Sequence, residues 1–177
     1  MPQSLRGCIA KYYHHNRSEL LAFYYKDHEI VEDRLEELKL ALSINDLWTE
    51  ENCEVLDKFS SFMRHELEHH LLEEELLLFP LIAKVLGEAS GPVRAMNTEH
   101  SQLRMLRAEL TAEIEACRRN KVRTERFNCL FQQVDECLAE HIYKENYVLF
   151  PMAEQILSED QKANALCELL NMRHRTN

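Results

Sequence analysis

The sequence predicts an all-α protein, folded as an up-down-up-down antiparallel four-helix bundle with a short fifth helix at its carboxyl end. Glycine and proline are scarce, with 3 Gly and 4 Pro in 177 residues, and this composition favours long helices over sheets and their turns. Apolar residues recur in alternating steps of three and four along four long segments, which is the period of helices that pack in a bundle. The connections between these segments are short, and short connections require antiparallel neighbours.

Capping residues and chain breaks give the helix boundaries. Thr49 is a candidate N-cap, and Ser158 with Gln161 forms a capping box for the last helix. The stretch 87–92 contains two glycines and a proline and interrupts the helical pattern. We expect the 177 residues to form a single domain whose core bundle covers about 18–157. The expected helices span about 18–43, 49–79, 92–119, 122–157 and 159–173.

Each of the four long helices has a seam of residues that is expected to face the bundle axis. The seam of the second helix is Leu56, Phe59, Met63, Glu66, His70, Glu74 and Leu77. The seam of the fourth helix is Phe127, Leu130, Val134, Cys137, His141, Glu145, Val148 and Met152. The first and third seams pass through His28 and His100. Four histidines and two glutamates therefore point at the axis.

These polar residues belong to a twofold internal repeat. His70-x-x-x-Glu74 and His141-x-x-x-Glu145 each place a histidine and a glutamate four residues apart, with Leu-Phe-Pro beginning four residues after the glutamate. Asp27-His28 lies 42 residues before His70, and Glu99-His100 lies 41 residues before His141. A spacing of four brings both side chains onto one face of a helix, about 5–6 Å apart at Cβ. The chain therefore consists of two helical hairpins, and each brings two histidines and a glutamate.

A carboxylate at a bundle axis requires compensation, because an unpaired buried charge costs several kcal/mol or more. Neutral imidazoles around a metal ion provide that compensation near neutral pH. Imidazole and carboxylate ligands without thiolate suit iron, manganese or zinc, and carboxylates shared between paired helices suit a dinuclear site. The predicted metal ligands are His28, His70, Glu74, His100, His141 and Glu145.

A ferritin-like di-metal bundle is the nearest alternative, and the sequence does not fit it. That class uses a lone glutamate on each of two helices and Glu-x-x-His on the other two. Glu66 and His69 have this spacing, but Leu138 stands three residues before His141 on the fourth helix. The lone positions on the first and third helices are histidines.

With these motifs the chain resembles the hemerythrin family, in particular its hemerythrin-like HHE cation-binding branch, over about residues 20–157. The resemblance implies that His28 and His70 bind one iron ion and that His100 and His141 bind the other. Glu74 and Glu145 would bridge the two ions beside an oxo or hydroxo group. Oxygen-carrying hemerythrins have a second histidine four residues after the first on the third helix, and this chain has Arg104 there.

Four further polar residues lie near the predicted ligands along the chain. Tyr24 precedes His28 by one turn and Glu32 follows it by one turn, while His65 and His69 lie off the seam of the second helix. Core packing is the default for the tyrosine and solvent exposure for the other three. The sequence leaves open whether any of them assists the site.

The composition excludes some classes of function. A net charge of −10 argues against a nucleic-acid or anionic-membrane surface, and no apolar run approaches the ~20 residues of a membrane span. The amino terminus lacks the apolar stretch of a secretory signal, and the six cysteines form no C-x-x-C pair, so we expect a cytoplasmic protein.

The expected function is that of a non-haem di-iron protein that binds oxygen, nitric oxide or peroxide at an open iron position, for binding, sensing or detoxification. One alternative is a di-iron enzyme that reduces peroxide or nitric oxide or donates iron for iron-sulfur repair. The other is a metal-free helical interaction domain, against which the buried carboxylates count. The physiological ligand and the oligomeric state do not follow from the sequence.

Overall fold

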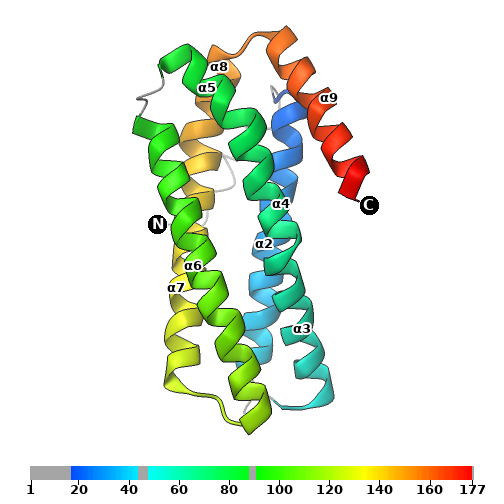
Figure 1. Ribbon diagram of the computed structural model, residues 1–177, viewed down its shortest axis with the longest axis vertical. Coiled ribbons are helices and arrows are strands. Elements are labelled where there is room, and N and C mark those ends of the chain that lie inside the picture. The colour runs from blue at the N-terminus through cyan, green and yellow to red at the C-terminus, as the bar shows by residue number, and fades with distance from the viewer. Residues whose placement is uncertain (1–16, 44–47, 88–90, 177) are drawn as a thin grey trace, which may run out of the picture.

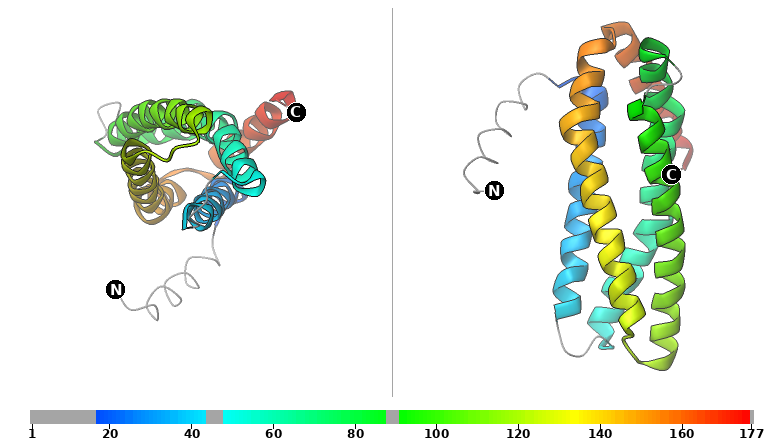
Figure 2. Two further views of the ribbon diagram at one scale, coloured as in Figure 1. Left: turned by 90° about the horizontal axis from the view of Figure 1, so that it is seen from below. Right: turned by 90° about the vertical axis from the view of Figure 1, so that its left-hand side faces the viewer.

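The computed structural model describes residues 17–43, 48–87 and 91–176, and in these ranges the chain is an antiparallel helical bundle, as predicted (Figures 1 and 2). We call each of the four long helical segments of the bundle a rod, whether or not a π turn interrupts it. The first rod is α2 (Glu19–Ser43), and the third is α6 (Gly91–Asn120). The second rod comprises α3 (Glu50–Arg64), α4 (Glu66–Glu73), the π-helical turn η1 (Glu74–Leu78) and α5 (Phe79–Leu86). The fourth comprises α7 (Glu125–Lys144), the π-helical turn η2 (Glu145–Leu149) and α8 (Phe150–Ile156), and α9 (Glu159–Thr176) follows it.

The predicted caps are confirmed. Thr49 Oγ1 accepts a hydrogen bond from the Asn52 amide at 3.2 Å, which caps α3. Ser158 and Gln161 bond reciprocally before α9, at 2.9 and 3.2 Å. Gly87, with φ of 94°, ends α5 in a conformation that side chains with a Cβ rarely adopt.

The prediction that the second helix ends near residue 79 is wrong, because the rod continues through Pro80 to Leu86. A π turn lies immediately before the proline, and the Phe79 amide donates to the Glu74 carbonyl five residues earlier. Proline has no N–H and clashes with the carbonyl four residues before it in a regular helix. The wider π turn accommodates that residue without ending the rod. The fourth rod repeats this arrangement before its own proline.

The π turns also shift the seam. Val148 and Met152 were expected at the axis, but Val148 is 55% exposed and Met152 is only half-buried. Leu149 and Ala153 are buried in their place, because a π turn adds one residue to the turn and rotates everything after it.

Two smaller differences lie before the π turns. Glu66 is exposed while its neighbour Leu67 is buried, and Cys137 is half-buried beside the buried Leu138. In the second rod the buried residue that follows Met63 is therefore four residues later instead of three, and the same holds after Val134 in the fourth rod. The result is that a leucine, rather than glutamate or cysteine, lies in the core.

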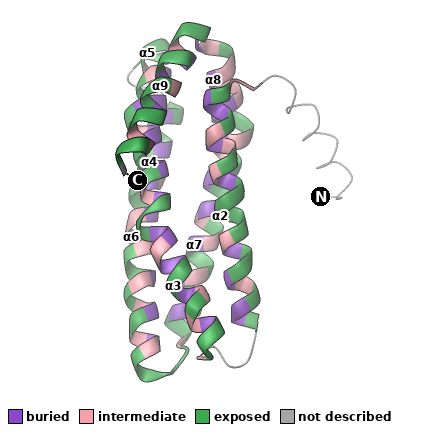
Figure 3. Ribbon diagram, turned by 90° about the vertical axis from the view of Figure 1, so that its right-hand side faces the viewer, coloured by how far each residue is buried: buried purple, intermediate pink, exposed green. Residues whose placement is uncertain are grey.

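Buried residues occur along the whole length of the bundle (Figure 3). The buried apolar residues form two clusters, and the predicted ligands lie between them. On α2, Tyr24 belongs to one cluster and Val31 to the other, and His28 lies between them in sequence. On α6, Met96 and Leu103 flank His100 in the same way. A buried polar layer therefore crosses the middle of the bundle.

The carboxyl-terminal helix α9 packs on the outside of the bundle, against α2 and η1 (Figure 1). None of the helices in the described ranges combines the length and the apolar character that a membrane crossing requires.

Candidate metal centre

The six predicted ligands come together in the polar layer, each less than 5% exposed. They come from all four rods of the bundle, so that side chains far apart in the sequence meet at one point. Their donor atoms form two overlapping groups in which all atoms lie within 4.8 Å of one another. One group is His28, His70, Glu74 and Glu145, and the other is Glu74, His100, His141 and Glu145.

Glu145 contacts a histidine of each hairpin. Its Oε2 lies 3.2 Å from Nε2 of His141 one turn earlier on the same rod, and 3.2 Å from Nε2 of His28 on α2. The first histidine of the amino-terminal hairpin therefore meets the glutamate of the other hairpin.

Glu74 likewise contacts a histidine of each hairpin, namely His70 of its own and His100 of the other. Its Oε1 lies 3.6 Å from His70 Nε2, and its Oε2 lies 3.4 Å from His100 Nε2 on α6. The two carboxylates are thus shared between the hairpins, and each belongs to both groups of donor atoms.

In the first hairpin, the outer nitrogens of both histidines donate hydrogen bonds away from the centre. His28 Nδ1 lies 2.8 Å from Asn146 Oδ1, and His70 Nδ1 lies 3.3 Å from Asp27 Oδ2. A neutral imidazole that donates through Nδ1 presents the lone pair of Nε2. The two Nε2 atoms lie 3.1 Å apart, an arrangement that a shared cation would stabilise.

The second hairpin repeats this arrangement. His100 Nδ1 donates to Glu75 Oε1 at 2.8 Å, and His141 Nδ1 donates to Glu99 Oε2 at 3.3 Å. All four rings therefore have an oxygen acceptor on the outer nitrogen, which is the usual arrangement of histidines that bind metals.

The acceptors follow the repeat, although sequence reasoning did not assign them a role. Asp27 and Glu99 immediately precede the first histidine of each hairpin, and each orients the second histidine of its own hairpin. Glu75 and Asn146 immediately follow the two central glutamates, and each orients the first histidine of the other hairpin. The feature of the sequence that could have identified these acceptors is that each one is adjacent to a predicted ligand in both copies of the repeat.

Each outer carboxylate is paired with a cation. Arg104, whose side chain is 27% exposed, points to Glu75 at 2.7 Å and to Glu68 at 2.9 Å. Lys144 Nζ lies 2.8 Å from Glu99. The three outer pairs are Asp27 with Arg173, Glu99 with Lys144, and Glu75 with Arg104.

Burial governs the protonation of the centre. It lowers the pKa of His70 and lowers that of His100 to about 4. Burial and the charge of Glu145 raise the pKa of Glu74 well above its ordinary range. Burial acts in the same direction on Glu145, but the imidazoles of His141 and His28 outweigh it and lower its pKa to about 2. The neutral imidazoles of His70 and His100, together with the ionised carboxylate of Glu145, are donors suited to a cation.

The donor atoms also lack other partners. In the described residues, both carboxylate oxygens of Glu74 and of Glu145, with Nε2 of His100 and of His141, are buried and have no hydrogen-bond partner. Buried polar atoms are normally paired, because leaving one unpaired costs about 1–3 kcal/mol. Metal ions coordinated by these atoms would satisfy them, so the residues present fit a metal centre.

The other polar candidates lie outside this group. Glu32, His65 and His69 are exposed. Tyr24 is buried with its ring edge-on to His70, at 5.9 Å between ring centroids, and its hydroxyl lies 3.5 Å from the Glu73 carbonyl oxygen. Of the four, only the tyrosine adjoins the centre.

Comparison with known proteins agrees with this geometry. Iron-sulfur cluster repair proteins YtfE from Salmonella paratyphi B, Salmonella newport and Salmonella heidelberg are each 34% identical to this chain over 106 residues. The match covers 55% of this chain and 46% of each relative, so the chain spans about half the length of the curated relatives it matches. No solved structure matches the chain. The family model of the hemerythrin HHE cation binding domain matches residues 19–153, and the chain therefore belongs to the hemerythrin HHE cation-binding family as a metal-binding protein.

Proposed function

We propose that this chain is a non-haem di-iron protein that binds a small ligand, namely oxygen, nitric oxide or peroxide, at an open iron position. Its role would be binding, sensing or detoxification. In this proposal each hairpin's pair of histidines holds one ion, and both central glutamates bridge the two ions beside an oxo or hydroxo group. The proposed ligands are His28, His70, Glu74, His100, His141 and Glu145. Manganese or zinc would suit the same donors.

One observation carries the proposal most directly. Six buried atoms of the centre have no hydrogen-bond partner among the described residues, and four of them are carboxylate oxygens of Glu74 and Glu145. Two carboxylates in contact with imidazoles of both hairpins suit two ions better than one. Glu74 directs one oxygen to a histidine of each hairpin, and Glu145 contacts a histidine of each hairpin through Oε2.

An open position is expected beside His100. Arg104 stands one turn after it, and its guanidinium is engaged by Glu75 and Glu68. A guanidinium stays protonated and cannot donate a lone pair to a metal. Bound iron would supply reversible redox change and a place for an exogenous ligand. The chain would supply burial, which keeps bulk water away, and neutral rings fixed by their outer hydrogen bonds.

A second candidate function is supported by the relatives. They are named as iron-sulfur cluster repair proteins, so a role as an enzyme, or as an iron donor for such repair, is the alternative proposal. Since the chain covers less than half of those proteins, the activity of the whole relative is a hypothesis here. We expect the cytoplasm as its compartment and no nucleic-acid partner.

Metal analysis with a visible spectrum of anaerobically purified protein tests the proposal. We expect two equivalents of iron, and a new charge-transfer band when azide is added to the diferric protein. A well-loaded sample with a single equivalent would contradict the dinuclear site, and no response to azide would contradict the open position. Arg104→His should change the azide affinity. Rapid turnover of peroxide or nitric oxide would favour the enzyme, and reversible oxygen spectra would favour the carrier.

Two variants locate the site within the chain. Glu74→Ala removes a shared carboxylate and should abolish dinuclear binding. His69→Ala, an exposed neighbour on the same rod, is the matched control and should retain the wild-type metal content. Equal loss of iron in both variants would contradict the assignment of ligands on the second rod.

A further inference from the structure

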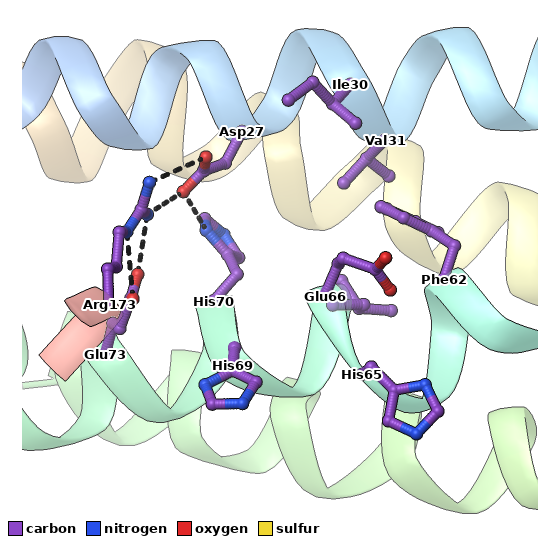
Figure 4. A pocket seen from close by; sticks show the side chains of 11 residues that line it. Asp27, Ile30, Val31, Phe62, His65, Glu66, His69, His70, Glu73 and Arg173 are labelled. Atoms are coloured by element: carbon purple, nitrogen blue, oxygen red, sulfur yellow. Dashed lines mark hydrogen bonds and ion pairs between the residues drawn. The ribbon is translucent and has the colours of Figure 1, made fainter. Parts of the chain in front are cut away.

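Arg173 extends from α9 to the outer side of the metal centre. Its Nε lies 3.0 Å from Glu73 Oε1, its Nη2 lies 2.7 Å from Glu73 Oε2, and its Nη2 also pairs with Asp27 Oδ2 (Figure 4). The arginine side chain is 30% exposed, whereas those of Asp27 and Glu73 are only 18% and 3% exposed. One guanidinium therefore joins two largely buried carboxylates that belong to different rods.

This contact reaches a proposed metal ligand through a single residue. Asp27 Oδ2, the oxygen that pairs with Arg173, also accepts the hydrogen bond of His70 Nδ1 at 3.3 Å. An acceptor on the outer nitrogen fixes both the tautomer and the orientation of a metal-binding imidazole. If the arginine is removed, the Asp27 carboxylate loses the group that fixes its position, and His70 loses part of its orientation.

Among the described residues, the outer carboxylates of the other half pair with cations that do not come from α9. Glu99, the counterpart of Asp27, is paired with Lys144 of α7, and Glu75 is paired with Arg104 of α6. The family model ends at residue 153, so the helix that carries Arg173 lies beyond the matched region. The two proposed metal positions thus differ in where their outer support comes from.

Two pockets beside these outer contacts differ in the same sense. A pocket of about 510 Å³ between α2 and α4 is lined by His70 itself, together with Asp27, Glu73 and Arg173 (Figure 4). A pocket of about 310 Å³ on the face of α6 and α7 is lined by Glu99 and Lys144 but by none of the six proposed ligands.

We propose that Arg173 is a positioning residue that determines how firmly His70 retains its metal ion, and that the pocket beside it is the route by which this ion exchanges first. The inference rests on the proposed di-iron function. It assigns the carboxyl-terminal helix a selective role, since Asp27, which orients His70, is the outer carboxylate that pairs with a cation of this helix in the described residues.

Release of iron to a chelator tests this role. The full-length protein is loaded with iron(II) without oxygen and mixed with excess bipyridine, and the absorbance of the iron–bipyridine complex is followed. In Arg173→Ala, we expect one of the two equivalents to leave about 10–100-fold faster than in the wild type, as for other changes outside the ligand set. Arg173→Lys should restore part of the retention. Arg175→Ala, an exposed arginine on the same helix, is the matched control and should behave as the wild type.

A double variant separates positioning from folding. Arg173→Ala leaves the Glu73 carboxylate buried without its cation and can lower stability for that reason alone. Arg173→Ala combined with Glu73→Gln removes this charge while Asp27 still lacks its partner. Fast release of one equivalent from a double variant with near-wild-type melting temperature supports the proposal.

Three results would overturn it: wild-type release from Arg173→Ala, equal acceleration in Arg175→Ala, or wild-type release from the double variant. Failure of the wild-type protein to take up two equivalents would instead contradict the di-iron function.

Discussion

Asn146 and Glu75 occupy equivalent places in the two hairpins, and each accepts a histidine Nδ1 proton at 2.8 Å, but one offers a neutral amide and the other a carboxylate. A carboxylate acceptor makes the imidazole a stronger electron donor than an amide acceptor does. We therefore expect Nε2 of His28 to donate electron density to a bound metal less strongly than Nε2 of His100.

Replacing the amide removes this difference. In Asn146→Asp, we expect the reduction potential of the bound iron to fall, because an imidazole that donates its proton to a carboxylate is a stronger ligand for the oxidised ion. Each tenfold change in that preference corresponds to about 59 mV. A redox titration measures the shift. Gln132→Glu, an exposed change of equal charge on α7, serves as the control. An unchanged or higher potential in Asn146→Asp would contradict the expected influence of the acceptor.

Removal of metal should lower the melting temperature. A ligand that binds only the folded state stabilises it by about 2.7 kcal/mol at one hundred times its Kd, and without it the unpartnered atoms of the centre stay buried. Calorimetry of the loaded and metal-free proteins at neutral pH measures the difference. If both forms melt together, the polar layer has some other source of compensation.

Glu74→Gln should have opposite effects on the two forms. It removes a metal ligand, but it also removes a carboxyl group whose pKa is raised by burial and by the Glu145 charge. We therefore expect the metal-free variant to melt above the metal-free wild type, by an amount equivalent to about 1–3 kcal/mol, and to gain little on addition of iron. A metal-free variant less stable than the wild type would show that the carboxylate is well compensated without metal.

The attachment of α9 should depend on pH. Glu154 accepts hydrogen bonds from the Ser18 hydroxyl at 2.9 Å and from Lys162 Nζ at 2.8 Å. Burial alone would raise the pKa of Glu154, but Lys162 and Ser18 outweigh it and lower the pKa below its usual 4.5. Because the folded-state pKa is depressed, the stabilisation is present above the unfolded-state pKa and is lost as the pH falls through the folded-state value.

Glu154→Gln should accordingly cost about 1–3 kcal/mol of unfolding free energy at neutral pH, and the cost should disappear in acid. Urea unfolding of the metal-free wild type and variant, at about pH 7 and about pH 3, measures both differences. A cost that is independent of pH would mean that shape rather than charge explains the effect.

The shift of the seam within η2 predicts a contrast between two neighbouring residues. Leu149 is 2% exposed and packs in the cluster that contains α8, whereas Val148 points to solvent. Leu149→Ala should cost about 2–5 kcal/mol, and Val148→Ala should change stability by no more than about 0.5 kcal/mol. Chemical denaturation of the two variants gives the values. The reverse order would indicate an uninterrupted α-helical register.

The fold and the convergence of the proposed ligands could be predicted because both depend on local periodicity. His70 and Glu74 lie four residues apart and repeat as His141 and Glu145, so their common face is readable from the chain. The π turns were not predicted, since helix propensity does not distinguish a π turn from an α turn. In both copies a proline lies six residues after the glutamate, and this repeated proline is the feature of the sequence that accompanies the π turns.

The outer contacts could not be predicted for a different reason. Arg173 and Asp27 lie 146 residues apart, and no periodic pattern links a terminal helix to a particular carboxylate across the bundle. From the sequence, Asn146 and Glu75 could be identified only as neighbours of predicted ligands. Their role as hydrogen-bond acceptors could not be predicted, because it depends on the orientation of imidazole rings on other rods.

The contacts of the central glutamates connect the two hairpins of the chain at the metal centre. His28 of the first hairpin meets Glu145 of the second, and His100 of the second meets Glu74 of the first. Neither hairpin alone contains a complete group of donor atoms. Bound metal would therefore act as a removable cross-link between the halves, in addition to the apolar clusters that both hairpins share, so that the hairpins open less readily when it is present.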